Sequence, residues 1–405
     1  MKIGLACIAF LAFGAVAQAQ TTVIHADRVL DGRGGTLHNI TIVVEGSRIA
    51  RVETAQPGRF PADYELGTLT VLPGLIDAHS HLAWYFNRSG RLHTSDDGDT
   101  PAQSILAAAG NAYATLLAGF TTVQSPGSPE DKDLRDWIAS GAIPGPRVLT
   151  SLEPLSDARL SPDSLRLLVR ERKKQGADLI KIFASKSIRE GGAATMTAEQ
   201  LDAMCGEARA QGLRTLVHAH STESMERAIH AGCTQIEHGV FATDAVLAEM
   251  ATKRVYFDPQ CGLVFHNYLD NRAKYDGIGN YNAEGFAAME RAIPLAQDVF
   301  RRAMATRYLK VVFGTDAVAG AHGRNAEELV CRVTNGRQTP MKAIISATSL
   351  AAEALGMQTR IGTLAPGYEA DIIGVDGDAS TDITALQRVR FVMKGGKVYS
   401  VLPRR

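Results

Sequence analysis

The sequence predicts an α/β protein built on a closed (β/α)8 barrel of the TIM type, with a small β-sandwich domain formed from both ends of the chain. Eight short apolar strands alternate with amphipathic helices through the middle of the sequence, which is the pattern of parallel α/β folds. Short β segments separated by glycine- and proline-containing turns occur only near the two termini. We therefore expect the two ends to pair into one small domain.

The composition is that of a globular protein long enough for more than one domain. Of 405 residues, 45% are hydrophobic and 21% are charged, and a barrel of this type takes about 250 residues. Basic and acidic residues number 43 each, so no excess of positive charge is available for nucleic-acid phosphates or an anionic membrane surface. We therefore expect neither nucleic acid nor a membrane as a partner.

The first nineteen residues have the pattern of a secretory signal. Lys2 precedes an apolar run over 3–16, and Ala17-Gln18-Ala19 has the form of an A-x-A cleavage site. The alternative, an uncleaved membrane anchor, is disfavoured because the run is shorter than the ~18 residues of a bilayer span. We expect cleavage after Ala19 and a secreted or periplasmic mature protein.

The expected domain division follows the change of pattern. A signal occupies 1–19, the composite β domain comprises 20–70 and 361–405, and the barrel covers 71–360. Barrel strands are expected at 71–81, 120–124, 147–150, 179–184, 215–219, 235–238, 255–258 and 310–315. Helices are expected at 102–118, 164–175, 198–211, 223–231, 244–253, 284–308 and 340–355. The four cysteines of the mature chain lack C-x-x-C spacing, and although export permits disulfides, we interpret them as mostly buried thiols: Cys205, Cys233, Cys261 and Cys331.

Residues typical of metal sites follow several of the predicted strands. Catalytic groups of such barrels lie at the carboxyl ends of the strands. The first strand ends with His79 and His81, which point to the same side about 7 Å apart. Later strands end with His218 and His220, with His238, and with Asp316. A histidine-rich site with one carboxylate suits zinc or a similar transition metal.

Lys181 lies inside the apolar run Leu179 to Ala184 of the fourth predicted strand. Lysine is rarely buried without a partner. One interpretation is that its head group reaches solvent along an apolar stem. The other is that Lys181 reacts with carbon dioxide to give a carbamate, which would turn a buried cation into a metal ligand.

An ordered set of motifs resembles the metal-dependent amidohydrolase superfamily, in the branch of imidazolonepropionase-like proteins, Xaa-Pro dipeptidases (prolidases) and ochratoxin-degrading amidohydrolases. The resemblance covers essentially the whole mature chain. The motifs are LPGLIDAHSHL (72–82), IKIFAS (180–185), HAH (218–220), IEHG (236–239), FGTDA (313–317) and LAPGYEADI (364–372).

The resemblance implies a dinuclear site with two divalent ions, expected to be Zn²⁺. It assigns His79, His81 and Asp316 to one metal, His218 and His238 to the other, and the carbamate of Lys181 to a bridge between them. A hydroxide shared by the ions would attack a polarised carbonyl. Asp316 would also shuttle the proton to the leaving nitrogen.

The resemblance leaves His220 without a metal. It is then either a catalytic or substrate-binding residue that polarises a carbonyl or orients a carboxylate, or a support for the site. Three basic residues follow strands four and eight and are candidates for pairing with a substrate carboxylate: Lys186, Arg189 and Arg324. His322 joins Arg324 in the polar cluster nearest Asp316. Three tyrosines are candidates for lining an aromatic pocket or for ordinary packing: Tyr85, Tyr268 and Tyr281.

The predicted function is hydrolysis of amide bonds in small carboxylated substrates such as Xaa-Pro or other dipeptides, N-acyl amino acids or ochratoxin-like amides. A cyclic amide or lactone is an alternative substrate, because the same hydroxide would attack either. A catalytically silent scaffold or binding protein is a further alternative, which retention of all six ligand-type residues disfavours. Assembly into a homo-oligomer stays open.

Overall fold

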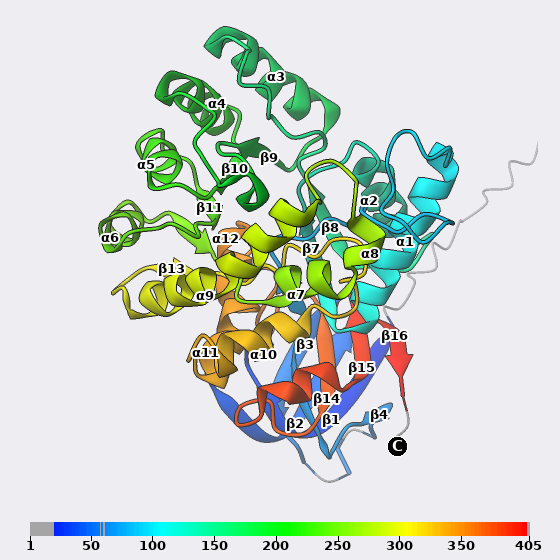
Figure 1. The fold of residues 1–405 in the computed structure, drawn as a ribbon. Helices are drawn as coiled ribbons and strands as arrows, with labels where there is room; N and C mark the ends of the chain where they lie inside the picture. The colour runs from blue at the N-terminus through cyan, green and yellow to red at the C-terminus, as the bar shows by residue number, and fades with distance from the viewer. Residues whose placement is uncertain (1–19, 57, 60, 403–405) are drawn as a thin grey trace, which may run out of the picture.

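The computed structural model describes residues 20–56, 58–59 and 61–402 (Figure 1). The predicted signal sequence at 1–19 lies outside the described residues. Within the described part of the chain, no helix is both long and apolar enough to cross a membrane.

The two ends of the chain meet in one mixed sheet of eight strands. The N-terminal segment supplies β1 (Thr21–Leu30), β2 (Thr36–Glu45), β3 (Arg48–Thr54), β4 (Tyr64–Glu65) and β5 (Leu69–Pro73). The C-terminal segment supplies β14 (Ile372–Asp376), β15 (Val389–Lys394) and β16 (Lys397–Val401). The strand order is β16-β15-β14-β5-β1-β2-β3, with β4 paired to β1. Antiparallel pairing of β5 with β14 joins the ends, and Figure 1 shows the blue and red strands side by side.

The middle of the chain forms the barrel. Its eight parallel strands are β6 (Leu75–Asp77), β7 (Phe120–Ser125), β8 (Arg147–Thr150), β9 (Leu179–Phe183), β10 (Arg214–Ala219), β11 (Gln235–His238), β12 (Tyr256–Asp258) and β13 (Lys310–Val311). They pair in two runs, β6 to β8 and β9 to β13. Hydrogen bonds link the runs at both seams: for example, Leu155 N donates to Lys181 O over 2.9 Å, and Ala78 N donates to Phe313 O over 3.0 Å. The predicted fold class is confirmed.

Helices cover the outside of these strands in Figure 1. They are α1 (Pro101–Leu117), α2 (Asp131–Ala139), α3 (Pro162–Gln175), α4 (Ala198–Ala210), α5 (Thr222–His230), α6 (Asp244–Lys253), α7 (Leu263–Asp270), α8 (Arg272–Tyr275), α9 (Ala283–Ala305), α10 (Ala326–Thr334), α11 (Pro340–Ser346) and α12 (Ser349–Ala354). Two 3-10 turns, η1 (Ile188–Glu190) and η2 (Ile383–Gln387), complete the described elements. Several helices begin at sequence signals for a start, as where Thr197 and Gln200 cap α4 reciprocally. The predicted division at residues 70 and 361 stays a prediction.

The expected strand over 71–81 is wrong in its extent. The chain leaves the mixed sheet at Pro73 and enters the barrel at Leu75. The passage from one sheet to the other requires glycine at position 74, because a Cβ there would lie only 2.1 Å from the Oγ1 atom of Thr121. His79 and His81 therefore lie beyond the end of β6. The expected strand over 310–315 is likewise shorter, ending at Val311.

The interpretation of the four cysteines as thiols is also wrong. Cys205 is bonded to Cys233, and Cys261 is bonded to Cys331. The first bridge joins α4 to the segment before β11, and the second joins the segment after β12 to α10. Sequence spacing carries no information about such pairs, because the fold brings together residues 28 and 70 positions apart.

Candidate metal centre

The first predicted ligand set converges at the carboxyl end of the barrel. The ligand atoms of His79, His81 and Asp316 lie within 4.8 Å of one another. The Oδ1 atom of Asp316 lies 3.1 Å from His81 Nε2 and 3.4 Å from His79 Nε2. Asp316 has a backbone φ of 53°, in the left-handed region that a non-glycine residue adopts at a cost. The surrounding structure therefore holds this carboxylate toward the two imidazoles.

A buried carboxylate below the site fixes this geometry. Asp77, in β6, accepts hydrogen bonds from Thr315 Oγ1 over 2.6 Å and from Asn325 Nδ2 over 2.7 Å. The backbone N–H of Asp316 donates to the carbonyl of His79 over 2.7 Å. The segment after β13 is thereby joined to the segment after β6, which brings residues 237 positions apart into one ligand set.

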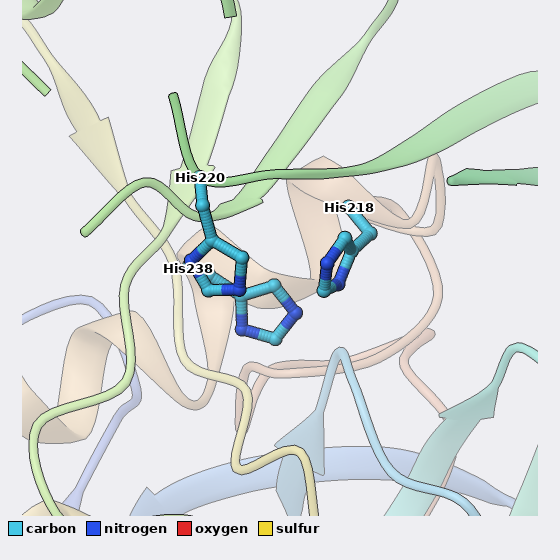
Figure 2. Close-up of side chains that lie close together, drawn as sticks. All are labelled: His218, His220 and His238. Carbon is cyan, nitrogen blue, oxygen red and sulfur yellow. The ribbon is translucent and has the colours of Figure 1, made fainter. Parts of the chain in front are cut away.

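The second predicted set, His218 in β10 and His238 in β11, is joined by the imidazole of His220, which directly follows β10. Figure 2 shows the rings of His218, His220 and His238 gathered around one point. Their ligand atoms lie within 4.8 Å of one another, and their ring centroids are 4.6 to 4.9 Å apart. His220, which the sequence argument left without a metal, therefore reaches the same space as the other two. The structure brings together all six predicted ligands and His220.

Lys181 is fully buried and forms an ion pair with Glu237 in β11. Its Nζ atom also lies 3.4 Å from His79 Nε2, so the lysine head group is inside the ligand cluster. A solvent-reaching head group is thereby excluded. The sequence argument missed Glu237, although the rule that buried lysine needs a partner was a signal for a carboxylate in another barrel strand; β10 lies between the strand of Lys181 and that of Glu237.

The electrostatics of the cluster suit metal binding. Burial is the largest cause that lowers the pKa of His79, His218 and His238 well below the usual value, and burial also lowers the pKa of His220 to about 3. These imidazoles are neutral at pH 7, which is the form that binds a metal ion. The buried Nδ1 atoms of His79 and His220 have no hydrogen-bond partner in the described structure. The residues present therefore fit one or two metal ions.

A second layer of polar residues orients His238. The Oε1 atom of Gln260 lies 2.7 Å from His238 Nδ1, and the Nε2 atom of Gln260 donates to Asp258 Oδ2 over 3.0 Å. Asp258 also pairs with buried Arg332, which in turn pairs with Glu328. Because the amide oxygen of Gln260 accepts, the Nδ1–H of His238 donates this bond, which leaves Nε2 of His238 free to bind metal. Sequence reasoning missed Gln260 and Asp258.

The ligand cluster lines a cavity of about 350 Å³. This volume is at the lower end of small-molecule sites. Its apolar wall includes Trp84, Val264, Phe265, Met289 and Val318. The cavity therefore suits a compact substrate with both polar and apolar parts.

The structure separates the candidates for substrate contact. Those that line the cavity are Lys186, Arg189 and Tyr268. Arg324 lies outside it and makes two hydrogen bonds to the carboxylate of Glu327. His322 is also outside the lining, with Nε2 3.3 Å from the carbonyl of Trp84. Two tyrosines are outside the lining as well: Tyr85 stacks on His93, and Tyr281 packs beside Tyr268.

Comparison with known proteins identifies the family of the chain. The amidohydrolase family model matches residues 70–399. An ochratoxinase of Aspergillus niger is 26% identical over 434 aligned residues, covering 94% of this chain and 87% of the relative. An imidazolonepropionase of Streptococcus gordonii is 24% identical, covering 80% of each chain. A crystal structure of a Xaa-Pro dipeptidase with bound methionine in the active site is 30% identical with a TM-score of 0.83, covering 94% of this chain and all of the other. The chain belongs to the amidohydrolase family.

Proposed function

We propose that this protein is a dinuclear metal-dependent hydrolase of amide bonds in small carboxylated substrates, such as Xaa-Pro or other dipeptides and N-acyl amino acids. The observation that carries the proposal is the convergence of two groups of ligand atoms in one cavity of about 350 Å³. The similarity to a Xaa-Pro dipeptidase and to an ochratoxinase supports the choice of an amide bond.

In this proposal His79, His81 and Asp316 hold one ion, and His218 and His238 hold the other. When bound, two zinc ions would supply Lewis acidity and a hydroxide nucleophile at neutral pH. The carboxylate of Asp316, which is partly exposed to the cavity, would take the proton of the attacking water and return it to the leaving nitrogen.

Lys181 is proposed as the site of a carbamate that bridges the two ions. Its Nζ atom is buried and lies 3.4 Å from His79 Nε2, so two added oxygens would reach the ligand cluster. Lys181→Ala should lose metal and most activity, and short carboxylates that fill the gap should restore part of both. Wild-type rates in that variant would show that the lysine is structural.

The test of the function is a chelator-reversible activity on a substrate panel. Protein stripped of metal and reloaded with zinc is assayed on dipeptides, N-acyl amino acids, cyclic amides and lactones, and its metal content is measured. We expect about two ions per chain and activity on the linear amides. Activity confined to cyclic amides or lactones would change the substrate class. A loaded protein inactive on all of them would support a binding role.

We also propose that the protein is exported and works in a secreted or periplasmic location. The two disulfides support this, because such bonds persist in oxidising compartments. N-terminal sequencing of protein recovered from a periplasmic fraction is expected to begin at Gln20.

A further inference from the structure

Arg189 is a cation in the cavity wall that lacks a carboxylate partner among the described residues. Three basic residues line the cavity: Lys181 pairs with Glu237, Lys186 lies 4.0 Å from Glu190, and Arg189 makes no ion pair with any residue that the structure describes. Its Nε atom donates to the amide oxygen of Asn280 over 2.5 Å. This neutral acceptor leaves the charge of the guanidinium uncompensated.

The guanidinium is held by aromatic rings on one side of the cavity. Its central carbon lies 4.1 Å from the ring centroid of Tyr281 and 5.5 Å from that of Tyr268. Both tyrosines are buried, so the contact is largely shielded from water and stronger than it would be on the surface. A stacked guanidinium keeps its terminal N–H groups at its edge, which is the geometry for two parallel bonds to a carboxylate.

The same cavity places this cation beside the ligand cluster and an apolar wall. Arg189, His220 and His238 line one space with Phe265 and Met289. A ligand that fills this space would meet a metal-binding face, a cation and an apolar surface at once. An amino acid or N-acyl amino acid with a free carboxylate and an apolar side chain has these three parts.

We propose that Arg189 determines specificity by binding the free carboxylate of the substrate, so that the enzyme prefers acids over the same molecules with a neutral group in that place. The inference rests on the proposed function and names the residue that gives it selectivity. Lys186 is not assigned this task because it is exposed and has an acidic neighbour.

The test measures binding separately from catalysis. Zinc-loaded protein is titrated calorimetrically with L-methionine and with L-methioninol, which differ only in the carboxylate. We expect wild type to bind methionine more tightly, by about 10- to 100-fold, which is the effect of a charge-assisted hydrogen-bond pair. Arg189→Met should abolish this preference, and Arg189→Lys should keep part of it.

Arg272→Met is the matched control. Arg272 also stacks on an aromatic ring, with its central carbon 4.6 Å from the centroid of Phe286, but it does not line the cavity. This variant should keep the preference for methionine. Zinc content and thermal stability of all variants show whether the Arg189 variants are folded and loaded.

Steady-state kinetics complete the test, measured on the carboxylic acid that the substrate panel shows to be hydrolysed fastest and on the matching carboxamide. Arg189→Met should raise KM for the acid about 10- to 100-fold with little change for the carboxamide. A wild type without preference, or an Arg189→Met variant that retains it, would overturn the inference. If the loaded protein hydrolyses nothing, the proposed function fails, while the methionine titration still decides the role of Arg189.

Discussion

Removal of the Cys261–Cys331 bridge should weaken both the fold and the metal centre. Cys261 follows Gln260, which contacts His238, and Cys331 precedes Arg332, which pairs with Asp258. The double substitution Cys261→Ala and Cys331→Ala cuts this connection between the segment after β12 and α10. The Cys205–Cys233 bridge joins outer elements, so its double alanine variant is the control.

The expected loss of stability follows from the lengths of the closed loops. In the chain-entropy model, a bridge over 70 positions contributes about 4.4 kcal/mol at 25 °C, and one over 28 positions contributes about 3.6 kcal/mol. Both double variants should therefore show lower midpoints of urea unfolding with similar losses of free energy. Treatment of wild type with a reductant should produce a loss of the same order.

The two variants should differ at the metal centre. Glu328 accepts hydrogen bonds from the backbone N–H groups of Cys261, Gly262 and Leu263 over 2.6 to 3.0 Å. These hydrogen bonds can still form without the disulfide, but no covalent bond then holds the segment after β12 against α10. We expect lower zinc affinity and a lower kcat/KM in the Cys261/Cys331 variant, because Gln260 becomes free to leave His238 and lost outer contacts typically cost about 10- to 100-fold.

The assays are urea unfolding followed by circular dichroism, zinc content after dialysis against a weak chelator, and steady-state kinetics. A loss below about 1 kcal/mol in the Cys261/Cys331 variant would refute the loop-closure reasoning. Equal losses of zinc affinity in both variants would show that the Cys261–Cys331 bridge has no particular role in orienting His238.

Three other outcomes are expected. His218→Ala should lose zinc, whereas His220→Ala should keep zinc and lower kcat/KM; zinc loss from the latter would make His220 a third ligand. Asp316→Asn should lose about 10²- to 10⁴-fold in rate on amides but much less on an activated ester, and equal losses would assign the leaving-group proton to another residue. Burial raises the pKa of Asp131 from 3.8 to about 7, so ionisation of this carboxyl lowers the stability of the fold as the pH rises. Metal-free Asp131→Asn should therefore be more stable than wild type at pH 8, by on the order of 4 kcal/mol. Urea unfolding at several pH values should show this difference shrinking toward pH 4.

The strand ends were predictable because their residues carry local signals. His218 and His238 lie at the carboxyl ends of apolar strands, and a parallel barrel collects these ends on one face. The partner of Lys181 was not found, because a carboxylate in another strand of the barrel has no fixed sequence spacing from the lysine. Register decides that pairing: Leu216 of β10 lies between Lys181 and Gln235, and Glu237 is two residues further along β11, on the same face as Gln235.

The sequence by itself determined the alternation of barrel strands with helices, the composite sheet from the two ends, and the candidate metal-binding residues, since the first two depend on local periodicity and the third on motif residues, most of them at strand ends. Tertiary structure decided that Cys205 and Cys261 are in disulfides and that Arg324 is paired outside the cavity. It also left Arg189 against two tyrosines beside the ligands. These outcomes depend on which distant segments meet when the barrel closes, and no local pattern of residues encodes such a meeting.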